Sequence, residues 1–155
     1  MKLIYKIKKP VYLGILVFLL ASPVFLPAMT ADGMEVLLSE KAVTYGQAAS
    51  FMLNASLGQS LTEEEAFKYA MDRKWLPKKV SQNDSAKLNG ISHLIMQSFG
   101  IKGGLMYSLT KSPHYAYRDL VYRNIIQGRT DPRMDVSGET LLFIVSRYFT
   151  IMGDE

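Results

Sequence analysis

The 155-residue sequence contains no cysteine. Disulfide bonds and thiolate metal sites are therefore excluded, and so is a lipid-carrying cysteine at the start of an exported chain. Such a chain must hold its fold by packing, and 48% of its residues are hydrophobic. An exported chain of this kind fits a bacterial periplasm or cell surface better than it fits a small disulfide-stapled toxin or growth factor.

Histidine is almost as scarce, because His93 and His114 are the only two and lie in different predicted elements. No His-x-x-x-His spacing is present, and no Gly-x-Ser-x-Gly nucleophile motif. The acidic run from Asp131 to Glu139 lacks the glycine and the final carboxylate of a calcium-binding EF-hand loop. We therefore predict no metal, no cofactor and no enzymatic activity, with His93 packed beside an apolar helix stripe.

The first 31 residues have the order of a secretory signal peptide. Lys2, Lys6, Lys8 and Lys9 precede an apolar run, which is followed by small and turn-forming residues. We predict cleavage after Ala28 or Ala31 and export to the periplasm or cell surface. Retention as a membrane anchor is the alternative, but the apolar run is shorter than the roughly 20 residues that a spanning helix needs.

Removal of this leader changes the charge balance. The sequence has 18 basic and 14 acidic residues, and four of the basic ones but none of the acidic ones precede Asp32. Residues 32–155 therefore carry 14 charges of each sign. The excess of positive charge belongs to the leader and does not indicate nucleic-acid binding.

Apolar residues at helical spacing predict an all-α fold. Capping boxes at Thr44–Gln47 and Thr62–Glu65, Ser112 before Pro113, and Ser137 mark four helix starts. We expect helices at 44–58, from 62 to about 75, at 112–126 and at 137–153. A further helix should begin between 84 and 89 and end at 99. We expect one or two helical turns in residues 32–41, and a loop or a short extended piece in residues 103–109.

These elements match one another at fixed spacings. A shift of 50 places Ala66 on Ala116, a shift of 47 places Leu94 on Leu141, and a shift of 93 places Thr44 on Ser137. We predict one α-helical repeat domain at 32–155, with units at about 32–58, 62–100 and 112–153. The capped second helix of each unit should join a central three-helix bundle.

The order of helix, aliphatic pair, glycine turn, polar loop and capped helix resembles the S-layer homology repeat of bacterial envelope proteins. The residues that carry the resemblance best are Ala116 to Gly128 (AYRDLVYRNIIQG) and Met134 to Tyr148 (MDVSGETLLFIVSRY). The resemblance implies three repeats, export, and noncovalent anchoring to cell-wall-linked polysaccharide.

One departure from that family concerns the ligand. The family's second helix typically opens with Thr-Arg-Ala-Glu, whose arginine helps to hold acidic glycan. The expected counterparts are Thr44–Gln47, Asn89–Ser92 and Ser137–Thr140, and none contains arginine. The resemblance therefore implies a glycan contact that is either absent or rebuilt from other residues.

Aromatic and basic residues gather in the last unit and form the candidate binding surface. Aromatic faces stack on sugar rings, and arginine forks a carboxylate or phosphate. In the alternative reading Tyr117 packs inward, while Arg118 and Arg123 pair with Asp119, Asp72 or Glu139. The candidate residues are Tyr115, Arg118, Tyr122, Arg123, Arg129 and Arg133.

The sequence thus predicts a noncatalytic envelope module that binds cell-wall glycan or an envelope protein. One alternative is a structural or assembly module with protein contacts and no glycan binding. The other is an exported hydrolase, which would need His93 or His114 beside an acid and a nucleophile.

Overall fold

Residues 31–153 are the part of the chain that the computed structural model describes, and they fold into helices with two isolated β-bridges. The all-α prediction is confirmed for this part. The predicted leader falls almost wholly on residues 1–30, outside the described part. Within 31–153, no helix has the length and the apolar character needed to cross a membrane.

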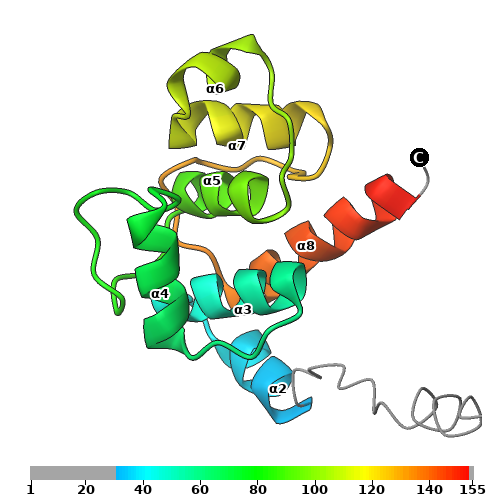
Figure 1. Ribbon diagram of the computed structural model, residues 1–155. Coiled ribbons are helices and arrows are strands. Elements are labelled where there is room, and N and C mark those ends of the chain that lie inside the picture. Colours follow the sequence, from blue (N-terminus) through cyan, green and yellow to red (C-terminus); the bar gives the residue numbers. More distant parts are fainter. Residues whose placement is uncertain (1–30, 154–155) are drawn as a thin grey trace, which may run out of the picture.

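The helices follow one another through short turns and two longer links (Figure 1). In chain order they are α2 (Ala31–Ser39), α3 (Tyr45–Leu57), α4 (Glu63–Asp72), α5 (Leu88–Ser98), α6 (Leu105–Thr110), α7 (Pro113–Tyr122) and α8 (Gly138–Gly153). The one or two turns predicted near 32–41 are the nine-residue helix α2.

Local hydrogen bonds from side chains cap the starts of α3, α4 and α8. Thr44 and Thr62 each form the predicted capping box. The threonine side chain accepts from the backbone N–H of the third helical residue, Gln47 or Glu65, whose side chain accepts from the threonine backbone N–H. Ser137 Oγ accepts from the backbone N–H of Thr140 at 3.1 Å. The signals that set these starts lie within four residues, so the sequence alone locates them.

Two helices end earlier than predicted. α4 ends at Asp72 and α7 at Tyr122, before the aliphatic pairs rather than at them. The chain turns at Lys74 (φ 61°) and Asn124 (φ 57°), both in the left-handed region. The backbone N–H of the residue after each turn, Trp75 or Ile125, then donates to a carbonyl of the preceding helix. Leu76, Ile125 and Ile126 are buried in the core as part of the links.

The segment from Gly103 to Leu109 was predicted as a loop or an extended piece, and this prediction is wrong. It contains α6, a six-residue helix that packs on α7. Tyr107 is the one residue of α6 that is buried, and it is 1% exposed. A helix with a single inward residue has no apolar periodicity that a sequence pattern could reveal.

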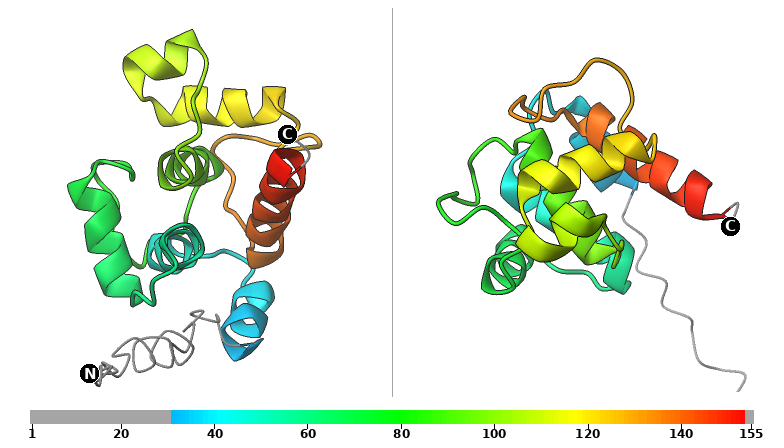
Figure 2. Two further views of the ribbon diagram at one scale, coloured as in Figure 1. Left: turned by 45° about the vertical axis from the view of Figure 1, so that its right-hand side comes forward. Right: turned by 90° about the horizontal axis from the view of Figure 1, so that it is seen from above.

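Three outer helices each pack on a different inner helix. α4 packs on α3, α7 packs on α5, and α2 packs on α8. The first described helix therefore lies against the last one, which closes the arrangement into a ring. Figure 2 shows α3 and α5 end-on beside α8, with α2, α4 and α7 outside them.

The links before the inner helices are joined by a cycle of backbone hydrogen bonds. Val43 N–H donates to Val136 O (2.8 Å), Val136 N–H donates to Ala86 O (3.1 Å), and Ala86 N–H donates to Val43 O (2.8 Å). All three residues are fully buried. Each junction thus donates one hydrogen bond to the junction before it in the chain and accepts one from the junction after it, and the bond from Val43 to Val136 closes the cycle.

A second cycle surrounds the first at the N-termini of the inner helices. The backbone N–H of the first residue of α3 donates to a carbonyl in the link before α5, and that of α5 donates to a carbonyl in the link before α8. The first N–H of α8 donates to a carbonyl in the link before α3, which closes the cycle. The bonds are Tyr45 N to Asp84 O (3.0 Å), Leu88 N to Met134 O (3.0 Å) and Gly138 N to Glu40 O (2.9 Å).

These cycles correct one predicted spacing. Val43 and Val136 reproduce the predicted shift of 93, but Ala86 and Val136 are related by 50, where 47 was predicted. Ile91, rather than Leu94, is then the counterpart of Leu141. The counterpart of Thr44 and Ser137 is Lys87, which precedes the first helical residue of α5 without a side-chain cap bond. The prediction that placed Asn89–Ser92 at this position is therefore wrong.

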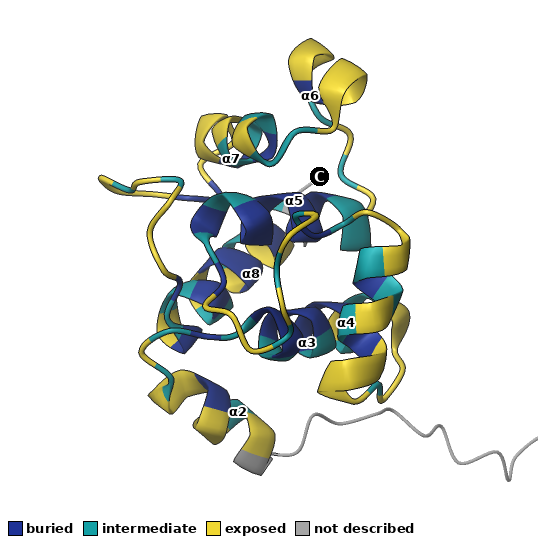
Figure 3. Cartoon of the chain, turned by 90° about the vertical axis from the view of Figure 1, so that its left-hand side faces the viewer, coloured by how far each residue is buried: buried dark blue, intermediate teal, exposed yellow. Residues whose placement is uncertain are grey.

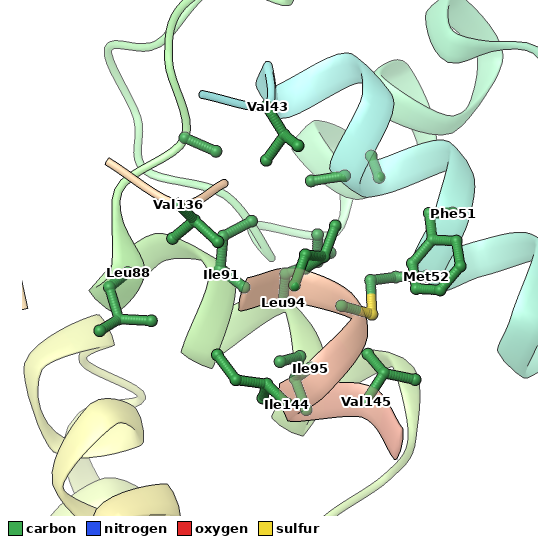
Figure 4. Packing of buried hydrophobic residues seen from close by; sticks show 14 of the residues in the cluster. Val43, Phe51, Met52, Leu88, Ile91, Leu94, Ile95, Val136, Ile144 and Val145 are labelled. Atoms are coloured by element: carbon green, nitrogen blue, oxygen red, sulfur yellow. The ribbon is translucent and has the colours of Figure 1, made fainter. Parts of the chain in front are cut away.

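Side chains of α3, α5 and α8 meet in the middle of the core. Met52 of α3, Leu94 and Ile95 of α5, and Ile144 and Val145 of α8 are buried and converge in Figure 4. Each fully buried aliphatic side chain contributes about 1.5–3 kcal/mol to folding. The core is thus shared by helices that lie far apart in the sequence.

Candidate functional site

A groove between α6 and α7 brings together three of the six candidate residues. Tyr115, Arg118 and Tyr122 line it, and its volume is about 310 Å³. The other lining residues are Gly104, Leu105, Met106 and Asp119. α7 places its residues there because 115, 118 and 122 recur at helical spacing on one face, opposite the buried Ala116 and Leu120.

Asp119 fixes the wall of this groove. Its carboxylate accepts a 2.7 Å hydrogen bond from the backbone N–H of Gly104, the residue before α6. This bond holds the start of α6 against α7. Gly104 is followed by exposed Leu105 and Met106, so the groove has apolar as well as polar lining residues.

The remaining three candidates are divided between two places. Arg123 lies at the end of α7, where its guanidinium donates to the carbonyl of Lys102 at 2.6 Å. Arg129 and Arg133 are exposed in the link between α7 and α8 and do not line the groove. The six predicted residues therefore do not form one surface. Three of them line the groove, Arg123 lies at the end of the same helix, and Arg129 and Arg133 lie outside the groove.

The alternative reading of these arginines is half right. Tyr117 points inward as it states, with its hydroxyl 2.9 Å from the carbonyl of Thr130. The expected ion pairs of Arg118 and Arg123 are wrong, since the single ion pair in the described part of the chain joins Lys87 to Asp135 at 2.7 Å.

The groove therefore combines two tyrosine rings with an arginine that no carboxylate neutralises within residues 31–153. Tyr122 is 88% exposed and Arg118 is exposed. This chemistry suits a sugar ring that carries a carboxylate or phosphate, because the ring can stack while the guanidinium binds the anion.

A second cluster of aromatic and arginine side chains lies at the end of α4. The guanidinium of Arg73 lies 3.6 Å from the ring centroid of Tyr69, and Tyr69 meets half-buried Trp75 edge-on at 5.7 Å. Because Arg73 already covers one face of Tyr69, this cluster offers less stacking surface than the groove.

His93 is held inside the protein by a directional chain of hydrogen bonds. It is 3% exposed, and its Nε2 lies 3.3 Å from the carbonyl of Lys74, which can only accept. Nε2 therefore carries the proton, and Nδ1 accepts from the Tyr107 hydroxyl at 2.9 Å. Tyr107 in turn accepts from the amide of Gln97 at 2.7 Å. Both imidazole nitrogens are satisfied, as expected for a packing histidine.

This burial makes stability depend on pH. The pKa of His93 is lowered below its ordinary value of 6.5, mainly by desolvation, with a smaller contribution from Lys111; the Lys74 carbonyl acts in the opposite direction. Since the unfolded chain then binds more protons, the stability present above pH 6.5 is lost as the pH falls below that value. We expect the urea midpoint to be lower at pH 5.5 than at pH 7.5.

The variant His93→Gln is the control for this prediction. It removes the titrating group, so its urea midpoint should change less between the two pH values than that of the natural chain. An equal loss in both proteins would show that another group is responsible.

His114 lies on α7 near the surface, edge-on to Tyr115 with the ring centroids 5.5 Å apart. The two histidines thus occupy separate places, one buried behind α6 and one exposed. In the described residues no group of three histidine or acidic side chains has the geometry to hold a metal ion.

Comparison with known proteins does not assign this site. No protein-family model matches the chain, and neither a curated protein nor a solved structure is significantly similar to it.

The sequence did not indicate the partner wall of the groove. Leu105 and Met106 belong to α6, which was expected to be irregular. The two consecutive glycines at 103 and 104 were the available signal, because close approach of a backbone to a side chain needs residues without Cβ. A Cβ at Gly104 would lie 3.3 Å from the Asp119 carboxylate.

Proposed function

We propose that this chain is an exported, noncatalytic module of a bacterial cell envelope, built from three degenerate repeats of the S-layer homology type. In this proposal α2–α3, α4–α5 and α7–α8 are the units, and α3, α5 and α8 form a central three-helix bundle. Its ligand is a cell-wall polysaccharide with acidic groups.

The observation that carries the proposal is the pair of hydrogen-bond cycles. Equivalent bonds join Val43, Ala86 and Val136, and equivalent helix starts follow each of them. Three copies of one unit, each packing its outer helix on the inner helix of the preceding unit, account for both cycles. The signal-peptide pattern of the first 31 residues supports export.

The groove between α6 and α7 is the proposed glycan site. The corrected counterparts of the family motif begin at Thr44, Lys87 and Ser137, and the residue after each is tyrosine, leucine or glycine rather than arginine. Arg118 supplies the missing guanidinium from a different helix, between Tyr115 and Tyr122. The site is thus rebuilt on the outer helix of the third unit.

Sedimentation with purified cell walls tests this site. The double variant Arg118→Ala/Tyr122→Ala should bind at least about tenfold more weakly, because loss of one ion contact and one stacking ring costs about 1.4 kcal/mol or more. The matched control is Arg129→Ala/Arg133→Ala, which removes two arginines outside the groove and should bind like the natural chain.

Two results would contradict the proposal. One is failure of the natural chain to sediment with walls at modest salt. The other is equal loss of binding in both double variants, which would indicate attraction to net charge without a defined site.

A further inference from the structure

α6 carries a cluster of apolar side chains that nothing in residues 31–153 covers. Leu105 is 74% exposed, Leu109 is 73% exposed and Met106 is 48% exposed. Leu109 follows Leu105 by four positions and Met106 by three, so it is a neighbour of both on the helix surface. Figure 3 shows α6 as an exposed element that projects from one end of the molecule. We name these three residues the α6 knob.

An apolar groove lies between α2 and α3, and its volume is about 330 Å³. Val36, Leu37 and Phe51 provide its apolar walls, with Gln47, Ser50 and Glu63 at its polar edge. This space is large compared with the ~30 Å³ of one water molecule, so it admits side chains. Val36 is 57% exposed. We name this feature the α2–α3 groove.

The two features carry opposite charge. Residues 99–124, which contain the α6 knob, include Lys102, Lys111, Arg118 and Arg123 against one acidic residue, Asp119, whose carboxylate binds the Gly104 amide. Residues 33–65, which supply the α2–α3 groove, include five glutamates against the single cation Lys41. Glu35, Glu63 and Glu64 are exposed there.

We propose that the α6 knob of one copy of this chain docks in the α2–α3 groove of another copy. α6 and α2 lie at opposite ends of the molecule, so the two features of one copy face apart (Figures 1 and 3). The contact joins two different surfaces, which makes it head-to-tail. Because a copy that gives its knob still has a free groove, the assembly grows beyond a dimer.

Other occupants explain less of the surface. A symmetric contact between two α6 knobs would bring two basic ends together, which like charges oppose. An anionic membrane would suit the basic knob but would leave the acidic α2–α3 groove without a role. Of these three occupants, a second copy is the one that accounts for both features.

Analytical ultracentrifugation of the purified full-length chain tests the proposal in the absence of cell walls. We expect the average mass to rise with protein concentration above that of one chain, and the association to weaken about tenfold between 50 and 500 mM salt as the charges are screened. A natural chain that stays monomeric, or an association that salt leaves unchanged, would overturn it.

Two double variants separate the surfaces. Leu105→Glu/Leu109→Glu removes the knob and keeps the groove, while Val36→Lys/Glu63→Lys blocks the groove and keeps the knob. All four side chains are exposed, so each variant should keep the helical circular dichroism spectrum of the natural chain. Each variant alone should be monomeric.

Mixing the two variants gives the decisive result. One intact knob and one intact groove remain, so an equimolar mixture should form a dimer of one copy of each and grow no further. Phe143→Glu is the matched control, because Phe143 is 50% exposed on α8 and lies outside both features; this variant should assemble like the natural chain.

Three outcomes would overturn the proposal. They are a mixture that remains monomeric, assembly that persists in either double variant, and a monomeric natural chain that binds phosphatidylglycerol vesicles through its knob. Leu105 and Met106 also line the proposed wall site, but the ultracentrifugation contains no cell walls, so each of these outcomes bears on the contact between copies and not on glycan binding.

Discussion

Gly138→Ala is expected to lower the free energy of unfolding by about 3 kcal/mol or more, at the upper end of the effects of overpacking. Gly138 is the first residue of α8, and a Cβ there would overlap the backbone carbonyl of Leu37 in α2. Backbone atoms cannot rotate away as a side chain can, so α2 must separate from α8. Urea unfolding followed by circular dichroism measures the loss.

Gly46→Ala is the matched control for this substitution. Its Cβ would meet the side chain of half-buried Gln82, 2.6 Å from Cγ, and this flexible side chain can rotate where a backbone carbonyl cannot. We expect a change within about 1 kcal/mol. If Gly138→Ala unfolds at the same urea concentration as the natural chain, the contact between α2 and α8 does not contribute to stability.

Tyr107→Ala is expected to cost about 3–5 kcal/mol, the range for truncation of a large buried aromatic residue. Tyr107 is 1% exposed and is the one residue by which α6 enters the core. Its removal leaves a cavity beside His93 and leaves Nδ1 without a donor. The same urea measurement gives the value.

Tyr107→Phe separates the hydroxyl from the ring. It keeps the volume and removes the donor to His93, so we expect a loss of about 1–3 kcal/mol, the cost of one unsatisfied buried polar group. Equal stability of the phenylalanine variant and the natural chain would contradict the directional chain through Gln97, Tyr107 and His93.

Sequence patterns located the elements that depend on local chemistry. The capping boxes at Thr44 and Thr62 and the cap at Ser137 are predicted by the sequence and are present. Each of these depends on hydrogen bonds or backbone angles within a few residues, so the necessary information is contiguous in the sequence.

Predictions failed where the deciding contact was distant. The shift of 47 was chosen by matching Leu94-Ile95 to Leu141-Leu142, but the bond between Val136 N and Ala86 O sets the shift at 50. A slip of three residues nearly preserves the face of a helix, so apolar spacing alone could not reject it. α6 was missed because one buried residue, Tyr107, holds it in place.

Three of the six candidate site residues lie in one groove, and the other three do not. Tyr115, Arg118 and Tyr122 share a face of α7 by spacing alone, and they line one groove. Arg129 and Arg133 were grouped with them because they follow closely in the sequence. The link turns away after Gly128, and closeness in sequence no longer means closeness in space.

The sequence by itself determined that the chain is helical, where most of its helices begin, and which of their faces are apolar. Only the tertiary structure decided that α2 closes the ring against α8, where a Cβ at Gly138 would overlap Leu37, and that the α2–α3 groove and the α6 knob remain uncovered at opposite ends. The physical reason is that caps and stripes arise between neighbours in the chain, whereas closure, grooves and unpaired surfaces arise from contacts between residues up to about 100 positions apart.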